Sequence, residues 1–349
     1  MSYLNRSLGL RSSVVRLLLG LVIGIGLAIS LPTLVGALGT YNPRYDVNDS
    51  GTIDIVDVQL VAGAWNTSGT PGVYGDASTY ELIVAKDGGE YQSIGAALEA
   101  ITQATASQPY LVRVLPGVYS ETITLKPYVH VQGSGPGITV ISTSVSSSVG
   151  PWETATVFGA SNARLSNLTV RNQGQGDYTV GIVNDSASPV IENVEVWVSG
   201  GDASYGIYNR FSTAQIREGL IVATGNSDAY GIYNYSANTS VSDLTVRAEG
   251  GNNENHGIHN ANSVPEIRRV VVAASGASGG DGYGVYNAPA TAYVNDSDLE
   301  GTTAALFTLS GSTTYVNNSR LANGRAGAGT FHCVGAFDAS YNALDANCQ

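Results

Sequence analysis

Apolar residues recur along the second half of the chain with a period near 25 residues. Each repeat has three core-type positions, x, x+3 and x+5, which small residues occupy in some copies. A period of this length, with short strands and turn-rich connections, is typical of one coil of a parallel β-helix, whereas a propeller blade needs about forty residues. We predict an all-β fold, a right-handed parallel β-helix solenoid. The triplets begin at Leu165, Ile191, Ile216, Val241, Ile267, Val294 and Val316.

A second pattern runs in step with the first: glycine, then Ile or Val, a variable residue, and Asn. Side chains of a strand point alternately to its two faces. We therefore expect the aliphatic and Asn side chains to point inward, with the Asn amides paired from coil to coil. The residue between them should point outward and form an exposed aromatic stripe. The copies are residues 181–184, 206–209, 231–234, 257–260 and 284–287, and the stripe is Tyr208, Tyr233, His259 and Tyr286.

This stripe has two interpretations. Aromatic side chains pack well between neighbouring strands, so the ladder can simply brace a sheet. Alternatively, flat rings with a polar rim suit the stacking of sugar rings, and the stripe is then a ligand-binding site. The aromatic residues one position before each glycine, such as Tyr205 and His256, should face inward or lie at a corner. His256 and His259 would then lie on opposite faces, which argues against a metal site between them.

Residues 1–37 have the pattern of an export signal. Three arginines precede a long apolar run, and Val35, Gly36 and Ala37 offer small side chains at which a signal peptidase can cleave. A retained signal anchor is the alternative, because the run is long enough to span a bilayer. Either outcome places the rest of the chain outside the cytoplasm, as a secreted or cell-surface protein.

The amino-acid composition limits the classes of molecule that this protein can bind. The formal net charge is -12 and only two of the 16 basic residues are lysines, so nucleic acid is disfavoured as a ligand. Cys333 and Cys348 are the only cysteines, and outside the cytoplasm we expect them to form a disulfide. That bond would close a C-terminal cap at residues 330–349, where the repeat pattern ends.

Residues 41–66 combine an acidic loop with a helical pattern, and a linker at 67–80 follows. Hard cations need several oxygen ligands from one short loop, with a sharp turn at the sixth position, which Gly51 occupies. The loop resembles half of a type I dockerin, and this implies calcium as the cofactor. Dockerins pair two such loops to bind cohesin scaffolds, and this chain has one copy. The predicted metal ligands are Asp46, Asn48, Ser50, the Thr52 carbonyl, Asp54 and Asp57.

Residues 82–141 resemble the opening of pectin methylesterases and related β-helix proteins. In that family a helix, here about residues 91–105, closes the first coil, and a G-x-Y-x-E turn follows the next strand. Gly117, Tyr119 and Glu121 match this turn. An end cap is physically required because a solenoid would otherwise expose its core and strand edges. We therefore place the β-helix at residues 81–329, with a helical cap at its start.

The catalytic motifs of the related enzymes have no counterpart in this sequence. The Q-D-T and D-F-I-F-G motifs of pectin methylesterases are absent, as are the N-T-D, D-D and G-H-G motifs of polygalacturonases. We therefore predict a non-catalytic protein that binds carbohydrate or serves as a structural or adhesive element. The alternative is a carbohydrate-active enzyme, pectinesterase-like or polysaccharide lyase-like, with a non-standard active site built from groups such as Asp185, Asp228 or Glu254.

Overall fold

The computed structural model describes residues 80–277 and 279–349. The predicted export signal (1–37), the calcium loop with all six proposed ligands (41–66) and the linker up to residue 79 lie outside the described residues. Among the described residues, no helix is long and apolar enough to cross a membrane.

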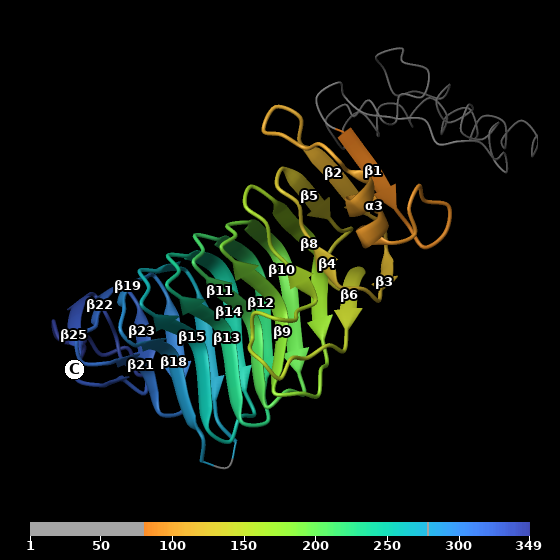
Figure 1. Cartoon of the computed structure of the whole chain (residues 1–349). Helices are drawn as coiled ribbons and strands as arrows, with labels where there is room; N and C mark the ends of the chain where they lie inside the picture. The colour runs from red at the N-terminus through yellow and green to blue at the C-terminus, as the bar shows by residue number, and fades with distance from the viewer. Residues whose placement is uncertain (1–79, 278) are drawn as a thin grey trace, which may run out of the picture. The chain divides into compact units, whose positions relative to one another are not determined.

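The described chain is a right-handed parallel β-helix in which every strand pair is parallel (Figure 1). Two sheets alternate along each coil. The large sheet runs in the order β1 (Tyr80–Val84), β2 (Tyr110–Val114), β5 (Val129–Gln132), β8 (Arg164–Asn172), β10 (Val190–Ser199), β12 (Gln215–Thr224), β14 (Ser240–Glu249), β16 (Glu266–Arg268), β19 (Thr291–Asn295), β22 (Thr313–Asn317) and β25 (Thr330–Val334). It also contains β3 (Gly117–Tyr119), β6 (Thr139–Thr143), β17 (Val271–Ser275), β20 (Asp298–Gly301) and β23 (Arg320–Ala322).

The small sheet supplies the other side of each coil. Its strands, drawn brightest in Figure 1, face the viewer there. In chain order they are β4 (Ile123–Thr124), β7 (Val157–Phe158), β9 (Tyr178–Asp185), β11 (Ala203–Arg210), β13 (Asp228–Tyr235), β15 (Glu254–Ala261), β18 (Asp281–Asn287), β21 (Ala304–Thr308) and β24 (Arg325–Ala326).

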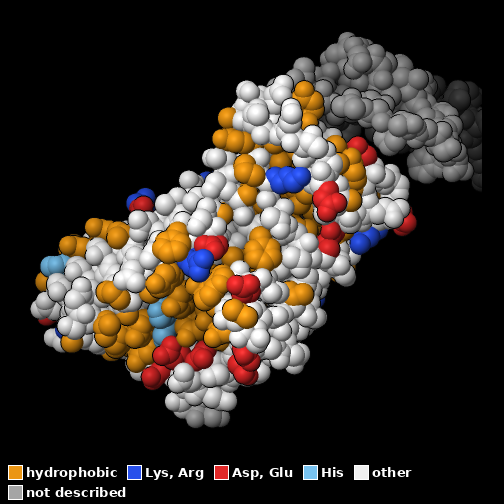
Figure 2. All heavy atoms as spheres, in the orientation of Figure 1, with side chains coloured by type: hydrophobic (Ala, Val, Ile, Leu, Met, Phe, Trp, Pro, Cys, Tyr) orange, Lys and Arg blue, Asp and Glu red, His pale blue; other side chains and the backbone are white. Residues whose placement is uncertain are grey.

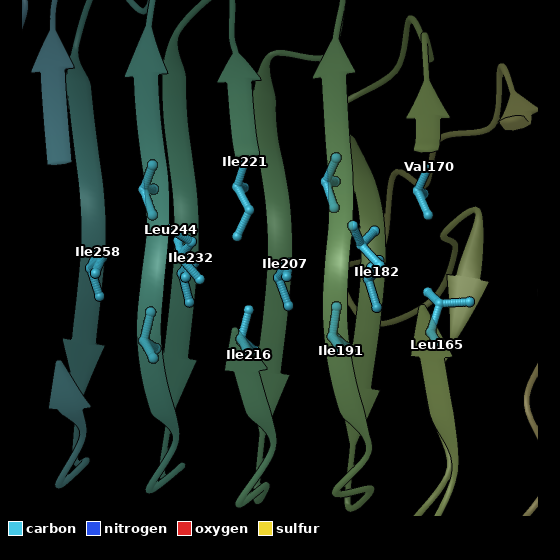
Figure 3. Close-up of a cluster of buried hydrophobic side chains, with 14 of the residues drawn as sticks. Leu165, Val170, Ile182, Ile191, Ile207, Ile216, Ile221, Ile232, Leu244 and Ile258 are labelled. Atoms are coloured by element: carbon cyan, nitrogen blue, oxygen red, sulfur yellow. The ribbon is translucent and has the colours of Figure 1, made fainter. Parts of the chain in front are cut away.

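The apolar triplets form the core, as the periodicity predicts. Leu165, Leu168 and Val170 are fully buried, and the aliphatic members of every later triplet are at most 5 % exposed. In Figure 3 the isoleucines of the small sheet, Ile182, Ile207, Ile232 and Ile258, form one row across successive strands, and Ile191 and Ile216 of the large sheet lie below that row. Several coils bend within the large sheet at a residue with positive φ, such as Asn167 (φ 55°) and Asn193 (φ 50°), and asparagine tolerates this conformation better than most residues.

The predicted asparagine ladder is confirmed. Each amide nitrogen donates to the amide oxygen of the next coil at 2.7–2.9 Å, and every member is fully buried. The last amide donates to the hydroxyl of Thr314. A buried amide is costly unless it is paired, so the ladder fixes both the register of the coils and the turn at the end of the small sheet. Its members are Asn184, Asn209, Asn234, Asn260 and Asn287.

The helical cap is present but shorter than predicted. Helix α3 spans Ile94–Ala100, because Ile101 has already turned to an extended conformation. The carboxylate of Glu121 accepts hydrogen bonds from the backbone N–H groups of Ile94 and Gly95, both at 2.8 Å. Tyr119 is fully buried and donates to the carbonyl of Leu115 at 3.0 Å. The G-x-Y-x-E turn therefore holds the cap to the first coils, which is a structural role.

The C-terminal end continues the large sheet for one more strand. β25 pairs in register with β22, so the repeat extends past the expected boundary at residue 330. The predicted disulfide between Cys333 and Cys348 is present, and it ties the last residues to β25.

Candidate active site on the small sheet

The outer face of the small sheet carries two parallel columns of aromatic rings, which we call the aromatic face. Neighbouring rings stack from coil to coil, for example Tyr205 on Tyr230 at 4.7 Å and Tyr233 on His259 at 4.3 Å between ring centroids. The columns also contact each other edge to face, as Tyr205 and Tyr208 do at 5.7 Å. One column is Tyr205, Tyr230, His256 and Tyr283, and the other is Tyr208, Tyr233, His259, Tyr286 and Phe307.

Tyr205, Tyr230, His256 and Tyr283 were expected to face inward or to lie at a corner, but they lie on the outer face beside the second column. Each strand places two consecutive residues inward, the glycine and the aliphatic residue after it, so strict alternation fails at that point. A Cβ on Gly231 would collide with Val246 of the core and come within 2.6 Å of the Gly257 carbonyl. The glycine thus permits a bulge-like step that returns the preceding residue to the outer face, and it recurs in β9, β11, β13, β15 and β18.

The stripe lies on the predicted face but is far less exposed than expected. Tyr208 is 5 % and His259 9 % exposed, because the second column packs beside them. Tyr233 and Tyr286 are half-buried. Figure 2 shows this face as a continuous orange area containing pale-blue histidine, bordered on one side by red carboxylates.

The two histidines form a direct pair, against the prediction that they lie on opposite faces. Their Nδ1 atoms are 2.8 Å apart, and Nε2 of His256 is buried without a partner among the described residues. Burial lowers the pKa of His259 to about 3, and burial with the neighbouring His259 lowers the pKa of His256 well below 6.5. Both rings are therefore neutral at pH 7. Within residues 80–277 and 279–349, no group of three or more His, Cys, Asp or Glu residues could hold a metal ion.

Carboxylates line the edge of the aromatic face where the strands of the small sheet begin. Glu254 accepts a hydrogen bond from the hydroxyl of Tyr230 at 2.9 Å. Asp228 accepts from the backbone of Glu254 at 3.1 Å, and Asp281 accepts from the hydroxyl of Thr303 at 3.1 Å. This acidic edge makes one long side of the face negative over five coils. Its members are Asp177, Asp202, Asp228, Glu254 and Asp281.

The opposite edge holds a carboxylate–guanidinium pair beside a pocket. Arg210, at the end of β11, donates from Nε and Nη2 to the two carboxylate oxygens of Asp185 on β9, at 2.9 and 2.8 Å. The guanidinium lies over the ring of Trp152 at 5.0 Å. The open pocket next to it has a volume of about 420 Å³, and none of the described residues that line it is a carboxylate. The lining residues are Pro151, Trp152, Tyr178, Tyr205, Tyr208, Arg210, Tyr233 and Tyr235.

Among the lining residues of this pocket, Arg210 is the one charged group, and a negatively charged ligand atom would be stabilised beside it. The hydrogen bond with Asp185 raises the pKa of Arg210, so the guanidinium is a permanent cation. Burial raises the pKa of Tyr208 to about 12, and burial raises the pKa of Tyr205 further. These phenols are protonated at neutral pH and can donate hydrogen bonds. The pocket thus combines ring faces, phenolic donors and one guanidinium held in a fixed direction.

Sequence reasoning named some of these groups and missed others. Asp185, Asp228 and Glu254 were candidates for a non-standard active site, and all three lie at the rim of the aromatic face. They do not form one cluster: Asp185 is at one edge, while Asp228 and Glu254 are at the other. Arg210 and Trp152 were missed. Arg210 follows Asp185 by 25 residues, one repeat later, and this offset was the available signal.

The chain is similar to known proteins in part of its sequence and in its fold. Residues 81–217 match the family model described as Pectinesterase. No curated protein sequence matches. Similar solved structures include a pectin methylesterase from Yersinia enterocolitica (15 % identity, 74 % of this chain and 93 % of that chain, TM-score 0.47). The pectin methylesterase from Aspergillus niger has 14 % identity (77 % and 88 % covered, TM-score 0.46), and that from carrot 13 % (77 % and 90 %, TM-score 0.44).

The match corrects the functional prediction made from the sequence. A non-catalytic binding, structural or adhesive protein was expected because the catalytic motifs are missing. The pectinesterase match contradicts this expectation and favours the alternative, a carbohydrate-active enzyme.

Proposed function

We propose that this protein is a carbohydrate-active enzyme, a pectinesterase-type hydrolase of esters on a polysaccharide. The observation that carries the proposal is the position of the pocket. The Asp185–Arg210 pair, Trp152 and Tyr208 all fall within residues 81–217, the segment that matches the pectinesterase family model. A carboxylate paired with an arginine on neighbouring coils is also the type of group that ester hydrolysis needs.

Each group has a role in this chemistry. Hydrolysis adds the oxygen of water to the acyl carbon and breaks the acyl C–O bond, and the alkoxy group leaves as an alcohol after taking a proton. The Asp185 carboxylate would accept the proton of the attacking water. The Arg210 guanidinium would stabilise the negative charge that develops on the carbonyl oxygen. Tyr208, protonated at neutral pH, is placed to donate a hydrogen bond to the same oxygen or to the leaving group.

The aromatic face would bind the polysaccharide. Its rings run across successive coils from the pocket towards Phe307, so a sugar chain lying across the strands meets a ring in each coil. Tyr208, Tyr233, His259 and Tyr286 are the ligand-binding residues proposed from the sequence, and Tyr205 now joins them beside the pocket. An extracellular location fits both a polysaccharide substrate and the disulfide.

Calcium remains a separate proposal. The donor set of the loop at residues 46–57 consists of carboxylate, amide, hydroxyl and carbonyl oxygens, which suits a hard cation. The ion would order that loop, and a cohesin-like scaffold would be the partner of such a loop. The ester hydrolysis proposed above requires neither the ion nor the scaffold.

The test measures alcohol or acid released from esterified polysaccharides. We expect the full chain to release methanol from methyl-esterified polygalacturonate or acetate from an acetylated polymer. Asp185→Asn and Arg210→Gln should each lower kcat/KM by about a hundredfold, the scale for losing one charge-stabilising group. The matched control is Asp243→Asn, because Asp243 forms the same two-bond pair with Arg269 on the large sheet.

Two results would overturn the proposal. One is a folded protein that releases neither alcohol nor acid from any ester polymer. The other is cleavage of the polymer backbone with an unsaturated product, which would identify a lyase instead.

A further inference from the structure

A second pocket lies on the outer face of the large sheet. It has a volume of about 320 Å³ and is formed by the second halves of β8, β10, β12 and β14. The pocket is built from a different sheet and shares no lining residue with the proposed active site. Its lining residues are Arg171, Gln173, Trp197, Val198, Ser199, Val222, Thr224 and Glu249.

Two arginines on this face, Arg171 in the pocket and Arg247 on the strand beside it, differ from the others in the described chain. Residues 80–349 contain ten arginines. Seven form ion pairs with Asp or Glu, and Arg325 donates to the carbonyl of Asn347 and lies over the ring of Phe331. Within the described residues, only Arg171 and Arg247 have side chains with no hydrogen-bond or ion-pair partner. Both are exposed.

These two arginines occupy one column of the sheet. Register places Arg171, Trp197, Val222 and Arg247 on four consecutive strands. With strands about 4.8 Å apart, the two guanidinium-bearing positions are about 14 Å apart. Trp197 lies between them and is 38 % exposed, and its Nε1 donates to Glu195 at 3.3 Å. An uncovered indole therefore separates two free cations.

A parallel column of polar side chains runs beside the first. Alternate residues of a strand share a face, so the residues two positions after the first column point the same way. They offer an amide, two hydroxyls and one carboxylate, that of Glu249. The members of this polar column are Gln173, Ser199, Thr224 and Glu249.

We propose that this face is a second binding site, for an anionic polysaccharide of the uronate type. Two unpaired guanidinium groups match carboxylates spaced along a polymer, because Arg pairs with carboxylate through two parallel hydrogen bonds. The exposed indole offers a stacking surface for a sugar ring, and the amide and hydroxyls suit its hydroxyl groups. The site does not depend on the proposed esterase activity, although hydrolysis of a uronate ester would generate the carboxylates that it binds.

Glu249 gives the proposal a directional test. Its carboxylate lies two residues from Arg247 on the same face and repels an anionic ligand. Glu249→Gln should therefore strengthen binding, whereas the loss of an arginine weakens it. The same change at Glu300, an exposed residue of β20 outside the pocket, measures the effect of net charge alone, and Glu249→Gln should exceed it.

The experiment measures binding of the full chain to de-esterified polygalacturonate by titration calorimetry, with a neutral polysaccharide that carries no ester as the comparison. The Arg171→Gln/Arg247→Gln variant should bind the polyanion at least about tenfold more weakly, and Trp197→Ala should also weaken it. Arg268→Gln is the control, because Arg268 is equally exposed but already paired with Glu266. Thermal unfolding verifies that each variant is folded, and release of methanol is measured on the same samples.

The outcomes separate the two proposals. Loss of polyanion binding in the double arginine variant supports the second site when methanol release is unchanged, and it also does so if the parent protein proves to have no esterase activity. Binding that is unchanged in the double arginine variant, or equal for the neutral and the anionic polymer, overturns it.

Discussion

The Nδ1 atoms of His256 and His259 lie 2.8 Å apart on the outer face of one strand, so one neutral imidazole donates a hydrogen bond to the other. The pair occupies the positions that Tyr230 and Tyr233 fill in the preceding coil and Tyr283 and Tyr286 in the next. A pair of histidines buried within a tyrosine ladder makes the aromatic face sensitive to acid, which a pair of tyrosines would not.

The first prediction concerns stability as a function of pH. The pKa of His259 is lowered to about 3 in the folded protein, and that of His256 is lowered as well, while both are near 6.5 when unfolded. The unfolded state therefore binds protons first. The stabilising contribution is complete above about pH 6.5 and is lost as the pH falls from 6.5 towards 3. The midpoint of thermal unfolding should fall over this range.

The variant His256→Tyr/His259→Tyr should reduce this pH dependence. It places at both positions the residue found in the neighbouring coils, and tyrosine does not bind a proton between pH 3 and 6.5. His332→Gln is the control, since His332 is exposed at the C-terminal end. If the double variant loses stability with acid as steeply as the parent protein, the histidine pair is not the cause.

The second prediction concerns the asparagine ladder. Asn234→Ala removes the acceptor of Asn209 and the donor to Asn260, and both amides stay buried. An unsatisfied buried polar group costs about 1–3 kcal/mol, so we expect the free energy of unfolding to fall by at least that amount. Denaturant unfolding measures it. Asn252→Ala, at an exposed turn, should change it little; equal losses at both positions would contradict a special role for the ladder.

The third prediction concerns the cap. Glu121→Ala removes the acceptor of two backbone N–H groups at the start of α3. Loss of a helix N-terminal acceptor costs about 1 kcal/mol, and here the same side chain also joins the helix to the first coils. Hydrogen exchange should show faster exchange in α3 and β1, with the coils around β13 unchanged. Faster exchange throughout the chain would mean that the cap and the later coils unfold as one unit.

The fourth prediction concerns the acidic edge. Asp177 and Asp202 are exposed at the edge of the aromatic face, where they repel a substrate that carries free carboxylates. Asp177→Asn/Asp202→Asn should lower KM for a partly de-esterified polymer by about two- to fivefold at low salt, since a screened surface charge is worth about 1 kcal/mol or less. KM for the fully esterified polymer should not change.

The control for this prediction is Asp296→Asn, which removes a charge at the bend that follows β19 in the large sheet. An equal effect of all three substitutions would mean that net charge alone matters. High salt should abolish the difference between the double variant and the parent protein.

The function expected from missing motifs was wrong, and the arrangement of the candidate site explains why. The residue strings of known active sites are absent from the sequence. The candidate site is instead distributed over coils, with Asp185 and Arg210 one repeat apart and Trp152 in a turn before β7. Each residue is unremarkable in its own stretch of sequence, and only the register between coils brings them together.

The sequence by itself determined the architecture. The period near 25 residues, the buried triplets and the asparagine ladder are all nearest-neighbour properties of a repeat, and they can be read because each coil contacts mainly the next. Only the tertiary structure decided which side chains lie on the surface and which of them have partners there. Whether Tyr205 and His256 point outward depends on Val246 and its equivalents in the opposite sheet, which leave room for glycine alone. The unpaired state of Arg171 and Arg247 beside Trp197 could be recognised only in the folded chain, where the other arginines of the described residues have partners.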